Sequence, residues 1–155
     1  LMFAGENFCK LDEKGRFLLP PYIRDLLCPE GQAGEKAVVF LKRSEPTCLR
    51  TYTLTEWTSV LTKTRARLDE DQSRLFMHHV VSETSTSEID KAGRILIPGK
   101  FRKHLNLADD QEIVLVGMFE FLEIWNPVDW RRRLAQMENQ HEASMSKIMD
   151  ILDRR

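Results

Sequence analysis

Short apolar blocks, separated by turn-forming residues, run through most of this chain. Two pairs of longer blocks, 37–42 with 49–54 and 112–116 with 121–125, are typical of buried β-hairpins. Shorter blocks flank two turns of the form Asp-x-x-Gly-Arg, in which Asp can bond the following backbone and Gly accepts a positive φ. The predicted strands are therefore 7–11, 16–19, 37–42, 49–54, 87–89, 94–97, 112–116 and 121–125.

Other segments have helical spacing. Short helices are predicted at 21–27 and 99–105, each preceded by a proline that ends the strand before it. Thr55 is a candidate N-cap for a helix that opens at the next residue, and 69–80 carries apolar residues on one helical face. Beyond Trp130, apolar side chains recur at spacings of three and four, which predicts an amphipathic C-terminal helix.

The chain contains one sequence pattern twice. Residues 11–20, LDEKGRFLLP, return as residues 89–98, IDKAGRILIP, and the match continues through the short helices and the hairpins. The spacing between matched blocks changes only in the connections, which are the segments that tolerate length changes. The duplication predicts a first repeat at 7–54, a helical connector at 55–82, a second repeat at 83–126 and a helical tail at 127–155.

The repeated turns are the candidate functional site. A two-stranded β-ribbon fits the major groove of double-stranded DNA, and Arg16 and Arg94 would stand at the tips of two such hairpins. A guanidinium forms two hydrogen bonds to guanine or to a phosphate. The residues expected to shape the loops are Asp12, Gly15, Asp90 and Gly93. The further candidate DNA contacts are Lys14, Lys91, Lys100, Arg24 and Arg102, with the last two expected to meet phosphates or solvent rather than bases. A purely structural Asp–Arg turn is the alternative, which the repetition of the same arginine disfavours.

The charge balance fits a local rather than a bulk attraction to nucleic acid. The 155 residues are 42% hydrophobic and 30% charged, as in a globular protein, and their formal net charge is −1. Within 90–103, however, Asp90 is the only acidic residue among five basic ones. A specific binder needs only such a local basic surface.

Several protein classes are disfavoured by the sequence. No apolar run approaches the ~20 residues of a membrane helix, and the first residues lack a secretory pattern, so a cytoplasmic protein is expected. Cys9, Cys28 and Cys48 are odd in number and lack metal-binding spacing, which predicts reduced thiols and no metal. The carboxylate clusters at 69–71 and 109–110 resemble solvated loops or helix starts. The adjacent His78 and His79 cannot share a metal in the i, i+4 manner. No catalytic residue, cofactor or small-molecule substrate is predicted.

With Ile124, Trp125 and Trp130 behind them, the two Asp-x-x-Gly-Arg segments resemble the MraZ family of bacterial transcriptional regulators, over nearly the whole chain. The resemblance implies a mixed α/β, mostly β fold: two AbrB-like swapped-hairpin β-barrel half-domains in an intrachain pseudo-dimer, with connecting helices and a C-terminal helix. It also implies a ring-shaped homo-oligomer in the nucleoid. That oligomer would bind G-rich direct repeats upstream of the division and cell-wall gene cluster and repress its own operon, with Arg16 and Arg94 contacting DNA.

A protein-interaction scaffold is the alternative function, because swapped-hairpin folds also serve as antitoxins and scaffolds. Met137, Met145 and Met149 in the tail are adaptable apolar contacts that could bind a partner. We expect this face to pack within its own subunit or oligomer, and we expect Trp57, Trp125 and Trp130 to be core or interface residues.

Overall fold

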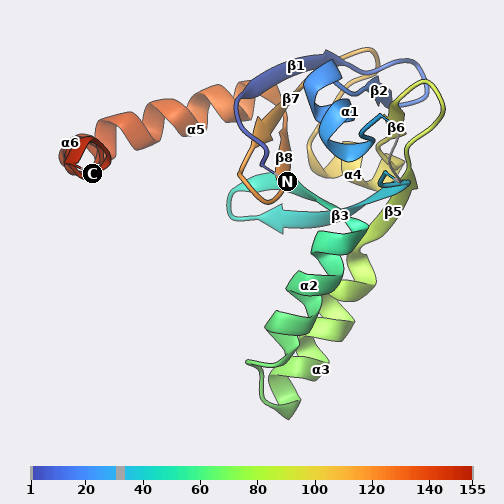
Figure 1. Cartoon of the computed structure of the whole chain (residues 1–155), viewed down its shortest axis with the longest axis horizontal. Coiled ribbons are helices and arrows are strands. Elements are labelled where there is room, and N and C mark those ends of the chain that lie inside the picture. The colour runs from blue at the N-terminus through green and yellow to red at the C-terminus, as the bar shows by residue number, and fades with distance from the viewer. Residues whose placement is uncertain (1, 31–33, 155) are drawn as a thin grey trace.

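The computed structural model describes residues 2–30 and 34–154 and has a mixed α/β fold (Figure 1). Every strand pairing among the described residues is antiparallel. In chain order the elements are β1 (Glu6–Lys10), β2 (Arg16–Leu18), α1 (Pro21–Leu27), β3 (Ala37–Ser44), β4 (Thr47–Thr53), α2 (Leu54–Arg65), α3 (Glu70–His79), η1 (Val81–Glu83), β5 (Ser85–Glu88), β6 (Arg94–Leu96), α4 (Gly99–His104), β7 (Glu112–Gly117), β8 (Leu122–Trp125), α5 (Pro127–Gln140) and α6 (Glu142–Arg154).

The two halves of the chain share their strands. The main sheet has the order β1-β7-β8-β4-β3-β5, so the predicted hairpins β3–β4 and β7–β8 are confirmed and lie side by side. At its edges, β1 of the first half pairs with β7 of the second, and β5 of the second pairs with β3 of the first. A separate two-stranded ribbon joins β2 to β6. The sequence copies are therefore interleaved in one fold.

Two details of the predicted architecture are wrong. The strands on either side of each Asp-x-x-Gly-Arg turn do not continue as a paired hairpin: β1 pairs with β7, β5 pairs with β3, and β2 pairs with β6. In the second copy an isolated bridge between Ile89 and Ile95 joins the two sides next to the turn. Nor do the described strands close into barrels, since β1 and β5 end the six-stranded order and β2–β6 is a separate sheet. The first difference arises because each strand next to a turn finds its partner in the other copy.

The main core lies on one face of the sheet and draws on both copies. Alternation along the strands places Phe40 and Leu115 in this core and Val114 on the opposite face, in a smaller cluster with Cys48 and Trp125. The ring of Phe40 packs edge-on against Phe101 of α4, with centroids 5.9 Å apart. Trp125 is thus a core residue, as predicted, while Trp57 and Trp130 are half-buried.

Cys9 and Cys48 are free and buried, and Cys28 is free and half-buried, as the prediction of buried or half-buried thiols requires. Burial, reinforced by nearby carboxylates, raises the pKa of Cys9 to about 11 and that of Cys48 to about 12. Both groups are therefore neutral thiols at physiological pH.

Two helical extensions project from the sheet body: α2 with α3, and α5 with α6 (Figure 1). The first begins earlier than predicted, because Thr53 rather than Thr55 caps α2 by accepting a hydrogen bond from the Glu56 N–H at 3.0 Å. The C-terminal tail is two helices, interrupted at His141, instead of one. No helix over the described residues combines the length and apolar character needed to cross a membrane.

The apolar face of α6 is exposed in the single chain, so of the two expected arrangements, packing within the subunit and packing within an oligomer, the first is not found. Five large apolar side chains on this helix are between 46% and 62% exposed. They are Met145, Ile148, Met149, Ile151 and Leu152.

Candidate nucleic-acid interface

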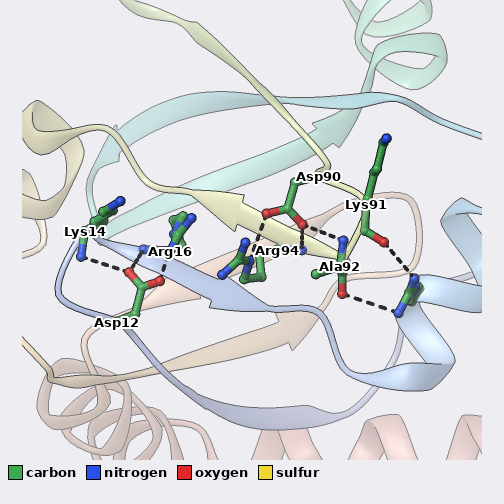
Figure 2. A network of polar contacts seen from close by, with 8 residues as sticks. Asp12, Lys14, Arg16, Asp90, Lys91, Ala92 and Arg94 are labelled. Atoms are coloured by element: carbon green, nitrogen blue, oxygen red, sulfur yellow. Dashed lines mark hydrogen bonds and ion pairs between the residues drawn. The ribbon is translucent and has the colours of Figure 1, made fainter.

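Both Asp-x-x-Gly-Arg turns fold in the same way (Figure 2). In the first, Asp12 Oδ1 accepts hydrogen bonds from the backbone N–H groups of Lys14 and Arg16, each at 2.9 Å. The other carboxylate oxygen accepts from Arg16 Nε at 2.8 Å. The backbone closes the turn through the Gly15 N–H and the Asp12 carbonyl at 3.0 Å. One carboxylate thus organises the loop and holds the arginine.

The second turn repeats these bonds. Asp90 Oδ1 accepts from Ala92 N–H at 3.0 Å and from Arg94 N–H at 2.8 Å, while Oδ2 accepts from Arg94 Nε at 2.9 Å. No atom of the described residues accepts a hydrogen bond from the Nη atoms of Arg94 or Arg16. Each guanidinium is therefore held through its Nε atom. Its two Nη groups remain available to bind a ligand.

Electrostatics keep both aspartates ionised. The backbone N–H of Arg16, with its guanidinium, lowers the pKa of Asp12 from the ordinary 3.8 to about 2. The Arg94 N–H and guanidinium likewise lower the pKa of Asp90. At neutral pH each turn therefore carries a formed Asp–Arg ion pair.

The β2–β6 ribbon brings the two arginines onto one face. Arg16 lies opposite Leu96 and Leu18 lies opposite Arg94, so these four side chains share the outer face. Phe17 and the residue opposite it, Ile95, occupy the inner face and are buried. Because the strands are antiparallel and each begins at its arginine, one turn stands at each end of the ribbon.

Leu18 and Leu96 are 58% and 42% exposed and were not among the predicted site residues. The signal was available, because strand alternation places the residue two positions after each arginine on the same face. The resulting outer face combines two guanidinium groups with two exposed leucines.

The remaining predicted contacts surround these turns. Lys14 and Lys91 are exposed within them. Lys100 is exposed on α4, where its Nζ lies 3.4 Å from the Glu83 carbonyl oxygen and 4.9 Å from the centre of the Phe101 ring.

Arg24 and Arg102 contact the turn of the opposite copy. The Arg24 guanidinium, from α1, donates to the carbonyls of Lys91 and Ala92 at 3.3 and 3.4 Å. Arg102, from α4, lies against Gly15 and donates through Nε to the Ile97 carbonyl at 3.0 Å. These contacts do not follow from the local sequence, because they depend on which segments of the two copies come together in the fold.

No group of three or more His, Cys, Asp or Glu residues in the described part of the chain is arranged to hold a metal ion. The structural features instead define a class: an internally duplicated α/β protein that shares strands between its halves and presents two matched Asp–Arg turns on one ribbon. Comparison with known proteins places the chain more narrowly.

The model of the family described as "MraZ protein, putative antitoxin-like" matches residues 2–78 and 80–151. Three relatives carry the name Transcriptional regulator MraZ. The protein of Moorella thermoacetica is 31% identical over 97% of this chain and 99% of its own length. That of Desulforamulus reducens is 33% identical over 97% and 100%, and that of Yersinia enterocolitica 34% over 86% and 85%. The chain therefore belongs to the MraZ family.

Proposed function

We propose that this chain is a sequence-specific DNA-binding transcriptional regulator that contacts bases through Arg16 and Arg94. The observation that carries the proposal is the placement of both arginines on one face of the β2–β6 ribbon, each held by the same aspartate bond. A ribbon of this width enters the major groove, and a guanidinium fork matches guanine O6 and N7. The name of the relatives supports the same class of function.

Basic residues around the turns supply the proposed phosphate contacts. Lys14 and Lys91 stand in the turns themselves, and Lys100 stands on the neighbouring helix α4. Because Asp12 and Asp90 offset part of this positive charge, DNA binding should depend on where the basic side chains lie as well as on the overall attraction to the phosphates. Each phosphate contact makes the affinity for DNA fall more steeply as the salt concentration rises.

The expected target is a set of G-rich direct repeats upstream of a division and cell-wall gene cluster that includes the gene for this chain. Binding there would repress that operon in the cytoplasm, at the nucleoid. We also propose a ring-shaped homo-oligomer, because several weak modules on one target gain affinity through multivalency. The exposed apolar face of α6 supports a contact with another copy.

The duplicated units are proposed to be residues 7–54 and 83–126, related as AbrB-like swapped hairpins, with a connector at 55–82 and a tail at 127–155. The cross-copy pairs β1–β7 and β2–β6 support this relation. The relation concerns strand exchange alone and does not require a closed barrel.

The test is fluorescence anisotropy of the full chain on a labelled duplex from its own upstream region, compared with a scrambled duplex at the same salt. We expect preferential binding of the native duplex, and its loss in the Arg16→Ala/Arg94→Ala variant. Light scattering should show that this variant keeps the oligomeric state of the original protein. Equal binding of both duplexes by the original protein would contradict sequence-specific regulation. It would favour a protein-interaction module, for which α6 offers an apolar surface.

A further inference from the structure

Gly15 and Gly93 each lie under an arginine that comes from the other copy. Their φ angles are +86° and +85°, a region that side chains disfavour. A Cβ on Gly15 would lie 2.6 Å from Arg102 Nε, and one on Gly93 would lie 3.1 Å from Arg24 Nε. Both turns thus favour glycine for its backbone conformation, and a Cβ there would also displace the guanidinium from Gly15 and press against the one at Gly93.

Backbone hydrogen bonds tie the same four segments together. The Gly15 carbonyl accepts from the Ile97 N–H at 2.9 Å, and the Gly93 carbonyl accepts from the Leu19 N–H at 2.9 Å. Arg102 Nε donates to the carbonyl of that same Ile97, directly beside the first turn. Each turn is therefore fixed by the end of the opposite ribbon strand and by the helix that follows it.

Arg24 contacts the second turn most directly. Its two Nη atoms donate to Lys91 and Ala92, the two residues between Asp90 and Gly93. Ala92 is also the residue whose N–H bonds Asp90 Oδ1, the carboxylate that holds Arg94 (Figure 2). A change in the Arg24 contacts is thus passed to Arg94 through a single loop.

We propose that Arg24 and Arg102 are crossed positioning residues: Arg24 orders the turn that presents Arg94, and Arg102 orders the turn that presents Arg16. This proposal deepens the proposed function and rests on it, because the two turns are taken to be the DNA-reading elements. It differs from the expectation of direct phosphate contact, since both Nη atoms of Arg24 and the Nε of Arg102 donate to protein carbonyls. Each half of the duplicated site depends on the other for its geometry.

The first test needs no DNA. Hydrogen exchange of the full chain, measured by mass spectrometry, should show faster exchange around residues 90–94 in Arg24→Gln, with little change around 12–16. Arg102→Gln should show the reverse pattern. Lys103→Gln is the matched control, because it removes a positive charge from an exposed position on the same helix as Arg102. Exchange that rises equally in both turns, or in neither, would overturn the proposal.

The second test uses double-variant cycles on the upstream duplex, read by anisotropy at several salt concentrations. Arg24→Gln should weaken binding by about tenfold in the original protein. It should cause almost no further loss when introduced into Arg94→Ala, and an additive loss when introduced into Arg16→Ala. The salt slope should stay unchanged, whereas loss of a phosphate contact lowers it by roughly one. Arg24→Lys should fail to restore binding, because one ammonium group does not reproduce the two hydrogen bonds that the guanidinium donates to two carbonyls.

The outcomes separate the two proposals. Additive effects for both pairs, a reduced salt slope or rescue by Arg24→Lys would overturn the crossed positioning role while leaving base contact by Arg16 and Arg94 intact. If the original protein binds the upstream and the scrambled duplex equally, the proposed function is wrong. The positioning role of Arg24 and Arg102 in DNA binding is then wrong as well. The crossed pattern of hydrogen exchange would then describe only the stability of the turns.

Discussion

Asp12 and Asp90 each accept two backbone N–H groups and one arginine Nε, which leaves the paired guanidinium little freedom to move. A long flexible side chain normally loses conformational entropy when a ligand fixes it. Here part of that conformational entropy is already lost when the chain folds, so less is lost when a ligand binds, and the arginines are pre-organised for it. The same bonds require an ionised carboxylate, so protonation of either aspartate would weaken its turn.

The lowered pKa of Asp12 predicts an acid-sensitive turn. Because its pKa falls to about 2 in the folded chain, from an ordinary 3.8, its contribution to stability is complete above about pH 4 and is lost as the pH falls through about 2. A carboxyl ¹³C NMR titration should show this midpoint. In Asp12→Asn, the free energy of unfolding measured with urea should no longer show the decrease that protonation of Asp12 causes below about pH 4. A titration midpoint near the ordinary value would contradict the hydrogen-bonded turn.

Several elements were predictable from local sequence. The short helix α1 has the predicted limits, Pro21–Leu27, because proline opens it and apolar spacing defines its buried face. The start of α2 was missed by two residues, since Thr53 and Thr55 are both acceptable caps and only the end of strand β4 selects between them. The break at His141 had no glycine or proline to signal it.

The cap of α2 gives a direct comparison of those two threonines. Thr53→Ala removes the acceptor for the Glu56 N–H and should lower the free energy of unfolding by about 1 kcal/mol. Thr55→Ala, at an exposed position, should change it by less than about 0.5 kcal/mol. Urea denaturation of both variants measures the difference, and equal effects would contradict the assignment of the cap.

At the scale of the whole molecule, the duplication is visible in the residues themselves, whereas an exchange of hairpins between the copies follows only from the family resemblance and its strand partners do not follow from either. Alternation fixes which face of a strand is buried, whereas the partner of β1 or β2 depends on segments far along the chain. Arg16 and Arg94 could be predicted as site residues because the same turn occurs twice. The contacts of Arg24 and Arg102 could not, because they exist only when the two copies interleave.

Interleaving predicts that one copy cannot fold alone as a monomer. In a fragment of residues 2–82, β1 and β2 lack β7 and β6, and Phe40 lacks Phe101. We expect no cooperative thermal transition by circular dichroism for the monomeric fragment, whose state sedimentation velocity would establish. The full chain under the same conditions is the control, and a cooperatively folded monomeric fragment would contradict the shared core.

The central claim, that Arg16 and Arg94 contact guanines, is tested most directly by dimethyl sulfate footprinting of guanine N7 on the upstream duplex. The account predicts that the original protein protects a set of guanines in the repeats. Arg94→Ala should expose one part of that set and Arg16→Ala the other, at protein concentrations that keep the duplex bound. If both variants protect the same guanines as the original protein, the ribbon arginines do not read the DNA.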